Sequence, residues 1–251
     1  IQKLNLVVPE WMFFDPKGDS MVIRKDKRGY DLIKNAKGLR VMPMLTNNVN
    51  GKWDGEVVRR IINDPVKSEK LISDLYKWIR SEGFTGINID FEALVEKDNR
   101  VLTSFLKKLT AKFHQGGLLT SIDVMPFNDD YDYKALAENT DYIFLMAYDQ
   151  YTSSTKPGPI SGQKWIEAAV DQIVKKVPIP KLVLCIAGFG YDWPKGGEGS
   201  DLTYQQALSI AKENGSKITY DNDSYNLYFS YKDKAGHERD VHFTDAATNF
   251  N

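Results

Sequence analysis

The sequence is poor in the residues that bind metals or form crosslinks. Its 251 residues contain one cysteine, Cys185, and three histidines. A single cysteine excludes an intrachain disulfide and a cysteine-based metal cluster. Because it lies within the apolar run 182–186, we predict a buried structural thiol. His114, His237 and His242 lack the spacing of metal ligands, so we expect no metal site.

Charge of one sign and long apolar runs are also lacking. The 33 basic and 34 acidic residues are interspersed and leave a net charge of −1, which gives no electrostatic reason to expect a nucleic-acid partner. No apolar run approaches the roughly 20 residues that span a bilayer, so we expect no membrane contact by this segment. The sequence shows no signal peptide and begins with Ile1, which predicts a piece of a longer, multidomain chain.

Six short apolar runs are typical of buried strands, because they are mostly continuous and too short for helices. They cover residues 4–9, 40–46, 86–92, 118–124, 142–148 and 181–187. Helical patterns separate several of them, and the clearest begins at Asp64 and Pro65, an N-cap followed by proline. Two further helices are expected over residues 101–113 and 165–177. Alternating strands and helices predict an α/β fold with a parallel sheet and helical crossovers.

Two architectures fit this alternation: an open doubly wound sheet and a closed (β/α)8 TIM barrel. No G-x-G-x-x-G turn follows the first strand, which disfavours a dinucleotide-binding sheet. A barrel has eight strands, and six are visible before Lys195. A helix over 204–214, three short β-like pieces and a hairpin at 233–236 then predict a small α+β insertion over 195–243. We therefore expect a single barrel domain over 1–251, truncated at both ends.

The segment 83–92 carries the most informative pattern. Side chains alternate along a strand, so Asn88, Asp90 and Glu92 share one face while the apolar residues between them share the other. The polar face ends at the carboxyl end of the strand, where barrel active sites lie. Close, buried carboxyl groups tend to share a proton, which raises the pKa of one toward a useful general-acid value. The alternative is that Glu92 caps the following helix and Asp90 satisfies a backbone group.

This strand resembles the D-x-x-D-x-D-x-E signature of glycoside hydrolase family 18. The equivalent residues are Thr85, Asn88, Asp90 and Glu92, so the final two acids are present and the first two are replaced. The form G-x-N-I-D-F-E is similar to the branch that contains spore-cortex-lytic enzymes and related peptidoglycan N-acetylglucosaminidases, in which asparagine at this position is usual. The departure at Asn88 therefore does not imply inactivity, and Thr85 is expected to alter only local support of the strand.

Other segments extend the resemblance over nearly the whole chain. Residues 146–149 are similar to the family's M-x-Y-D on the sixth strand, and residues 188–193 resemble the Y-G-Y-D-W region at the seventh. Segments 42–47 and 121–126 correspond to the third and fifth strands. Counted this way, residues 4–9 form the second strand.

The resemblance implies a retaining glycosidase that cleaves β-linked N-acetylglucosamine-containing glycans by substrate-assisted catalysis. Glu92 is expected to protonate the leaving oxygen and then activate water. Asp90 would orient the substrate's acetamido group and stabilise its positive charge, and Tyr148 would donate its hydroxyl to the acetamido oxygen. Asn88 and Asp149 would support positioning. This chemistry requires no cofactor.

Further side chains are candidates for contact with the substrate. Four aromatic residues follow strand ends and could stack on sugar rings or simply pack, as Tyr148 also could; Trp193 has the best case. These aromatic residues are Trp11, Trp53, Tyr191 and Trp193. The predicted pocket lining comprises Glu10, Asn47, Asp123, Met125 and Met146.

Two other functions remain open at this point. One is a catalytically weak or inactive glycan-binding barrel of a larger envelope protein, which the replacements at Thr85 and Asn88 suggest and the presence of Glu92 disfavours. The other is an unrelated sugar-phosphate barrel enzyme, which no glycine-rich phosphate loop supports. Chitin-like glycans, peptidoglycan and poly-N-acetylglucosamine are all possible substrates. The resemblance implies an extracytoplasmic location.

Overall fold

The computed structural model describes residues 4–15 and 20–248. The chain divides into two compact units, each described by itself below. The first unit comprises the chain up to Val124 with 128–144 and 176–183, and the second comprises 125–127, 145–175 and the chain from Leu184 onward.

The first unit is built on a mostly parallel sheet with the strand order β11-β10-β9-β8-β5-β2-β3. Strands β2, β5, β8 and β9 are parallel neighbours, β3 pairs antiparallel with β2, and β1 pairs parallel with β4. β10 (Tyr142–Met146) and β11 (Leu182–Cys185) begin in this unit. The other strands are β1 (Leu6–Val7), β2 (Glu10–Phe14), β3 (Met21–Ile23), β4 (Arg40–Val41), β5 (Met44–Thr46), β6 (Asn48–Val49), β7 (Lys52–Trp53), β8 (Gly86–Asp90) and β9 (Leu119–Val124).

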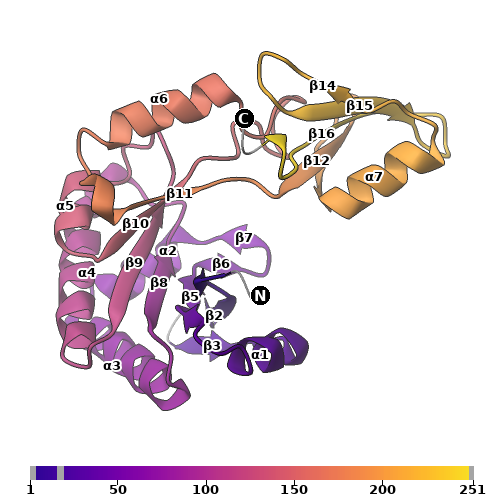
Figure 1. Ribbon diagram of the computed structural model, residues 1–251. Coiled ribbons are helices and arrows are strands. Elements are labelled where there is room, and N and C mark those ends of the chain that lie inside the picture. The colour runs from indigo at the N-terminus through magenta and orange to yellow at the C-terminus, as the bar shows by residue number, and fades with distance from the viewer. Residues whose placement is uncertain (1–3, 16–19, 249–251) are drawn as a thin grey trace. The chain divides into compact units, whose positions relative to one another are not determined.

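Helices of the first unit follow the strands, and α3, α4 and α5 lie beside β8 and β9 (Figure 1). α3 (Pro65–Glu82) begins as predicted, because Asp64 accepts hydrogen bonds from the amides of Val66 and Lys67. α4 spans Asn99–His114, and its apolar side is buried. The remaining helices are α1 (Lys27–Lys34), α2 (Gly55–Ile62), α5 (Tyr133–Glu138) and the 3-10 turns η1 (Glu96–Asp98) and η2 (Ile179–Lys181).

The predicted α/β barrel architecture is confirmed in its strands. All six apolar runs contain a strand, with β1 in the first run and β4 and β5 in the second. The neighbouring strand of the seven-stranded sheet, β2, begins at Glu10, directly after the predicted end at Pro9, and its register with β5 is irregular between Glu10 and Met12. α1, α2 and α5 were not predicted, since each is short and α1 buries no residue. That two further barrel strands lie outside this stretch stays a prediction.

Close approach of β8 and β9 depends on Gly86. A Cβ atom at this position would lie 2.1 Å from the carbonyl oxygen of Leu119, a distance that no side chain can tolerate. The two residues are direct partners in the parallel register. Glycine therefore allows the two strands to pair at the start of β8.

The second unit contains α6 (Gln163–Ile173) and a five-stranded antiparallel sheet in the order β13-β12-β16-β15-β14. α7 (Tyr204–Glu213) packs on this sheet through a core that includes Ala207, Ala211, Phe229 and Phe243. The strands are β12 (Phe189–Pro194), β13 (Ser200–Thr203), β14 (Thr219–Tyr220), β15 (Leu227–Lys232) and β16 (Glu238–Phe243).

The predicted helix, β-like pieces and hairpin of the insertion are all present. β15 and β16 pair antiparallel around the turn at 233–236, where Gly236 has a φ of 86°. β12 and β13 were not predicted as strands. Because β12 belongs to the antiparallel sheet, that sheet begins at Phe189, before residue 195, where the insertion is predicted to begin. The single-domain assignment and the limits 195–243 stay predictions.

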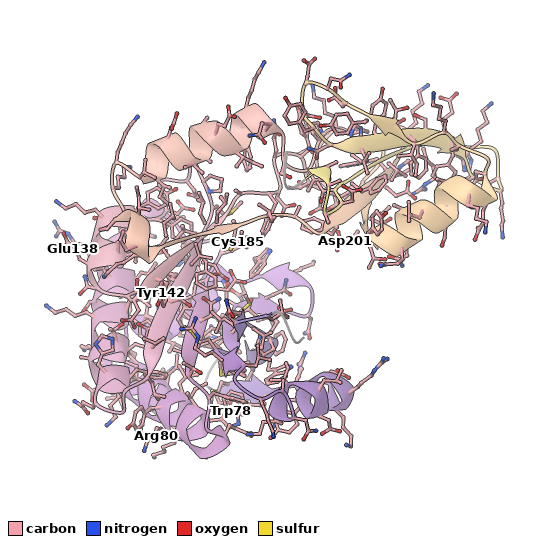
Figure 2. All side chains as sticks on the ribbon, in the orientation of Figure 1. Trp78, Arg80, Glu138, Tyr142, Cys185 and Asp201 are labelled. Carbon is pink, nitrogen blue, oxygen red and sulfur yellow. The ribbon has the colours of Figure 1, made fainter. Side chains whose placement is uncertain are left out.

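The prediction of a buried cysteine is wrong. Cys185, labelled in Figure 2, ends β11 and is partly exposed. Its neighbour Leu184 is 44% exposed. β11 lies at one edge of the seven-stranded sheet in the described part of the chain. An edge strand can leave apolar side chains accessible even when its sequence reads as a core strand.

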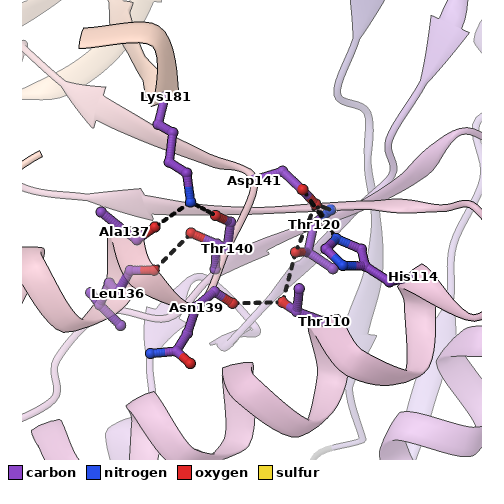
Figure 3. A network of polar contacts seen from close by, with 9 residues as sticks. All are labelled: Thr110, His114, Thr120, Leu136, Ala137, Asn139, Thr140, Asp141 and Lys181. Atoms are coloured by element: carbon purple, nitrogen blue, oxygen red, sulfur yellow. Dashed lines mark hydrogen bonds and ion pairs between the residues drawn. The ribbon is translucent and has the colours of Figure 1, made fainter. Parts of the chain in front are cut away.

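A polar network joins the helices and strands of the first unit (Figure 3). Lys181 Nζ donates to the carbonyl oxygens of Ala137 and Thr140, at 2.6 and 2.8 Å, and so binds the end of α5 to the start of β11. Asp141 accepts from the backbone amide of Thr120 at 2.7 Å and pairs with His114.

Among the described residues no helix has the length and apolar character to cross a bilayer.

We expect Lys181→Met to lower the free energy of unfolding by about 1–3 kcal/mol, because it leaves two partly buried carbonyl groups without their charged donor. Urea unfolding followed by circular dichroism measures this. Lys107→Met, at an exposed position on α4, is the matched control and should change stability by less than about 0.5 kcal/mol. Equal effects in the two variants would contradict the structural role of Lys181.

Candidate active site

The register of three parallel strands brings polar side chains together at the end of β8. Thr46 on β5 is the partner of Asp90, and Ser121 on β9 is the partner of Asn88. All five residues of β8 are buried, with Asn88 fully buried and Asp90 only 5% exposed. Polar groups placed this deep require hydrogen-bond partners, so their contacts define the site.

Asn88 connects β8 with β9 through both ends of its amide. Its Nδ2 donates to Oδ2 of Asp123 at 2.7 Å, and its Oδ1 accepts a short hydrogen bond from the hydroxyl of Ser121. A hydroxyl can donate to the amide oxygen, and a carboxylate can accept from the amide nitrogen, so these partners fix the orientation of Asn88.

Asp90 is a buried carboxyl group with one oxygen, Oδ1, that has no hydrogen-bond partner. Burial raises its pKa from the ordinary 3.8 to about 7, the negative charge of Glu10 adds to the increase, and a hydrogen bond with Thr46 opposes it. Desolvation penalises the charged form of a carboxyl group, which accounts for the direction. Asp90 can therefore hold or release a proton near neutral pH.

Asp123 lies in a similar environment. Its Oδ1 is also buried without a partner, and burial raises its pKa well above the usual range. The negative charges of Asp90 and Glu92 raise it further, while the hydrogen bond from Asn88 opposes them. Desolvation is thus the main cause of the raised pKa of Asp123, and the charge of Asp90 adds to it.

Glu92 follows β8 and is held through its backbone. Asn47 Nδ2 donates to the Glu92 carbonyl at 2.7 Å, and the Glu92 amide donates to Asn47 Oδ1 at 2.8 Å. The hydroxyl of Tyr131 donates to the Phe91 carbonyl at 2.9 Å. The next helix, α4, has Asp98 as its N-cap, so the alternative that Glu92 caps that helix is wrong.

Thr85 supports the opposite end of β8. Its amide donates to the Val41 carbonyl at 2.8 Å, and its hydroxyl accepts from the Val41 amide at 3.3 Å. These bonds tie the start of β8 to Val41 on β4, and the effect of the replacement on local support of the strand stays a prediction.

The second unit holds the other predicted group. The hydroxyl of Tyr191 donates to Asp149 Oδ1 at 2.7 Å, and Asp149 has a φ of 62°. Burial raises the pKa of Asp149, and the bond from Tyr191 opposes that increase. Tyr148, Phe189, Tyr191 and Trp193 form a continuous row of ring contacts with centroids 5.5–5.6 Å apart.

The aromatic candidates differ in exposure. Trp193 is fully buried and its indole nitrogen donates to the Thr152 carbonyl at 3.1 Å, so its place is that of a packing residue rather than an open sugar platform. Trp11 is 5% exposed and packs against Tyr30 and Phe84. Trp53, on β7, is 39% exposed.

Among the predicted site residues, the first unit gathers six around the end of β8. They are Glu10, Asn47, Asn88, Asp90, Glu92 and Asp123. Met125, Met146, Tyr148, Asp149, Tyr191 and Trp193 belong to the second unit. Sequence reasoning missed three side chains of the first unit that contact this group: Thr46, Ser121 and Tyr131. Thr46 and Ser121 lie on predicted strands and could have been found from the register, whereas Tyr131 lies in a loop without a periodic pattern.

These acidic residues do not form a metal site. Within the described ranges, no group of three or more histidine, cysteine, aspartate or glutamate residues could hold a metal ion. The partners of Asp90 and Asp123 are instead a hydroxyl and an amide, which are suited to controlling protons.

Comparison with known proteins identifies the family of this chain. The sequence profile of "Glycosyl hydrolases family 18" matches residues 13–248. The chain belongs to this family. Its fold is therefore the barrel of family 18 chitinases, and its relatives are glycosidases. The chain is 26% identical to a chitinase from Chromobacterium violaceum, whose crystal structure superposes with a TM-score of 0.87 over 97% of this chain and 80% of that one.

Two relatives come from Bacillus subtilis. YdhD, which carries the name of a sporulation-specific glycosylase, is 28% identical over 82% of this chain and 52% of its own length. The cortical fragment-lytic enzyme is 27% identical over 85% of this chain and 53% of its own length. The chain thus spans about half the length of these relatives.

We expect Asp90→Asn to stabilise the protein at pH 8 and to matter less toward pH 4. The folded state binds a proton to Asp90 more tightly than the unfolded chain does, so wild-type stability falls as pH rises from about 4 to about 7. A shift from 3.8 to about 7 corresponds to about 4 kcal/mol at pH 8. Urea unfolding at both pH values measures the difference, with the exposed Asp129→Asn as control. A stability gain that is independent of pH would refute this account.

Proposed function

We propose that this chain is the catalytic barrel of a retaining glycosidase that cleaves β-linked N-acetylglucosamine-containing glycans. The observation that carries the proposal is the end of β8, where Glu92 is fixed by Asn47 beside the buried carboxyl groups of Asp90 and Asp123. A fixed acid next to carboxyl groups with raised pKa values is the arrangement that general acid–base catalysis needs near neutral pH.

In the first step the Glu92 carboxyl group gives its proton to the glycosidic oxygen as the bond from C1 to that oxygen breaks. The carbonyl oxygen of the substrate's own 2-acetamido group bonds to C1 and forms an oxazolinium ring, so no carboxylate of the protein has to act as nucleophile. Asp90, ionised, stabilises the positive charge on that ring and accepts from its N–H.

In the second step the Glu92 carboxylate removes a proton from a water molecule. The water oxygen bonds to C1 and the bond from C1 to the acetamido oxygen breaks, which returns the acetamido group with the β configuration retained. Glu92 regains its proton and is ready for another cycle. No cofactor takes part in this scheme.

The roles proposed for the second unit rest on the sequence motif. Tyr148 is expected to donate its hydroxyl to the acetamido oxygen, and Asp149 to support it. The bond from Tyr191 to Asp149 gives that carboxyl group a defined orientation within its own unit. Met125, Met146 and Tyr191 are kept as proposed substrate contacts.

The substrate proposal follows the relatives. One is named for lysis of cortical fragments and another is a chitinase, and both names indicate glycans that contain N-acetylglucosamine. We propose an extracytoplasmic location and a longer multidomain parent protein for the same reason. A glycan-binding barrel with weak or no activity remains the second candidate, because Thr85 and Asn88 together replace two of the four acids of the family signature.

Glu92→Gln should reduce hydrolysis of chitin oligomers, peptidoglycan fragments or poly-N-acetylglucosamine by a factor of about 10³ or more, because the amide has no proton to give at neutral pH. Glycan binding, measured by calorimetry, should persist. Glu69→Gln on the exposed face of α3 is the control. Undiminished hydrolysis by Glu92→Gln would refute the assignment, and a wild-type protein that binds but never cleaves would favour the binding module.

Asn47→Ala should lower kcat by about tenfold or more and change KM little, because Glu92 would lose both backbone hydrogen bonds that hold its loop. Steady-state kinetics on the best of the three glycans measures this. Asn48→Ala, one residue further along the chain, is the matched control. If Asn47→Ala raised only KM, Asn47 would be a binding residue instead.

A further inference from the structure

Two acids of the family signature are replaced in this chain, and at the second of these positions, Asn88, the structure has another carboxyl group within hydrogen-bond distance. Asn88 replaces the second acid of the motif, and its Nδ2 donates to Asp123 on the neighbouring strand β9. We propose that Asp123 is the proton-sharing partner of Asp90 and therefore a positioning residue for the reaction. This inference rests on the proposed function for its catalytic consequence, although the pairing itself does not.

The parallel register supports the pairing. Asn88 is the partner of Ser121 and Ile89 that of Ile122. Continued by one residue along both strands, this register would set Asp90 beside Asp123. Neighbouring strands lie about 4.8 Å apart, close enough for facing carboxyl groups to share a hydrogen bond. On its other side Asp90 is the partner of Thr46, whose hydroxyl is hydrogen-bonded to it.

Both carboxyl groups have one satisfied and one unsatisfied oxygen. Oδ2 of Asp123 accepts from Asn88, whereas Oδ1 of Asp123 and Oδ1 of Asp90 are buried without partners. Each of these two oxygens therefore lacks a hydrogen bond, and two bare acceptors on neighbouring residues of adjacent strands repel each other. A single proton held between them turns one carboxyl group into a donor and satisfies both atoms.

The groups around the pair favour retention of that proton. Asp90 and Glu92 on and after β8 act on Asp123, and Glu10 on β2 acts on Asp90. All three are acidic, and Tyr131, which interacts with Asp90 and Glu92, is a neutral phenol. Negative neighbours disfavour a second negative charge on the pair, so one proton stays over a wide pH range.

Asn88 fits this assignment better than a carboxylate would. Because its Oδ1 accepts from Ser121, its Nδ2 faces Asp123 and presents a donor. An aspartate at this position would bring a third carboxyl group against Asp123 and remove that donor. The amide at 88 and the acid at 123 are therefore complementary, and the pair keeps Asp90 in one orientation and sets its ionisation.

The test compares Asp123→Asn with Asp123→Ala in the full chain. Asparagine keeps the size of the side chain and can donate to Asp90 through its amide, whereas alanine removes the donor. We expect kcat of Asp123→Ala to fall about tenfold or more below that of Asp123→Asn, with KM values within a factor of about two. Equal kcat in Asp123→Ala and the wild type would overturn the proposal.

A second readout needs no activity and so separates this inference from the proposed function. Carbon-13 NMR of labelled aspartate carboxyl groups should show two coupled transitions displaced to high pH in the wild type. In Asp123→Asn the higher transition should vanish, and Asp90 should ionise at lower pH there than in Asp123→Ala. If Asp123→Ala does not fold, loss of the higher transition in Asp123→Asn still decides. Transitions of Asp90 that are identical in the wild type and every folded variant would refute the pairing.

Discussion

The alignment of three parallel strands is the constraint on which the candidate site depends. The register fixed by backbone hydrogen bonds pairs Thr46 with Asp90 and Ser121 with Asn88, so the side chains of each pair meet without help from a flexible loop. Glu92 lies just beyond this rigid part, where Asn47 bonds both of its backbone groups. Regular strands thus position the buried carboxyl groups, and the amide side chain of Asn47 positions Glu92, the proposed proton donor.

The same strand alignment buries two carboxyl groups, those of Asp90 and Asp123, which costs stability. Asp90 and Asp123 each keep a buried oxygen without a partner, and burial is the main cause of their raised pKa values. Such groups weaken the folded state when they ionise. The surrounding strands are rich in fully buried apolar residues, among them Leu45, Ile87 and Ile122, whose packing offsets this cost. Strain of this kind is common where proteins perform chemistry.

Sequence reasoning predicted what periodicity encodes. The six strands and α3, with Asp64 as its cap, follow from apolar runs and capping chemistry, and the shared face of Asn88 and Asp90 follows from strand alternation. It missed β12, whose residues read as a motif, and the partial exposure of Cys185, because neither sheet order nor edge position is local information. The bond from Tyr131 to the Phe91 carbonyl and the bond from Asn88 to Asp123 were also beyond it, since they join groups 40 and 35 residues apart in the chain.

The site depends on the lack of a side chain at Gly86. The space that a methyl group would fill at this residue is occupied by the backbone of β9, 2.1 Å from where a Cβ atom would stand. Any side chain there would have to displace the backbone of β9 at Leu119, on the strand that also carries Asp123. The pairing of β8 and β9, on which the spacing of Asp90 and Asp123 depends, thus requires that residue 86 carry only a hydrogen atom. Tolerance to substitution at residue 86 therefore reports on proton control at Asp90, four positions away.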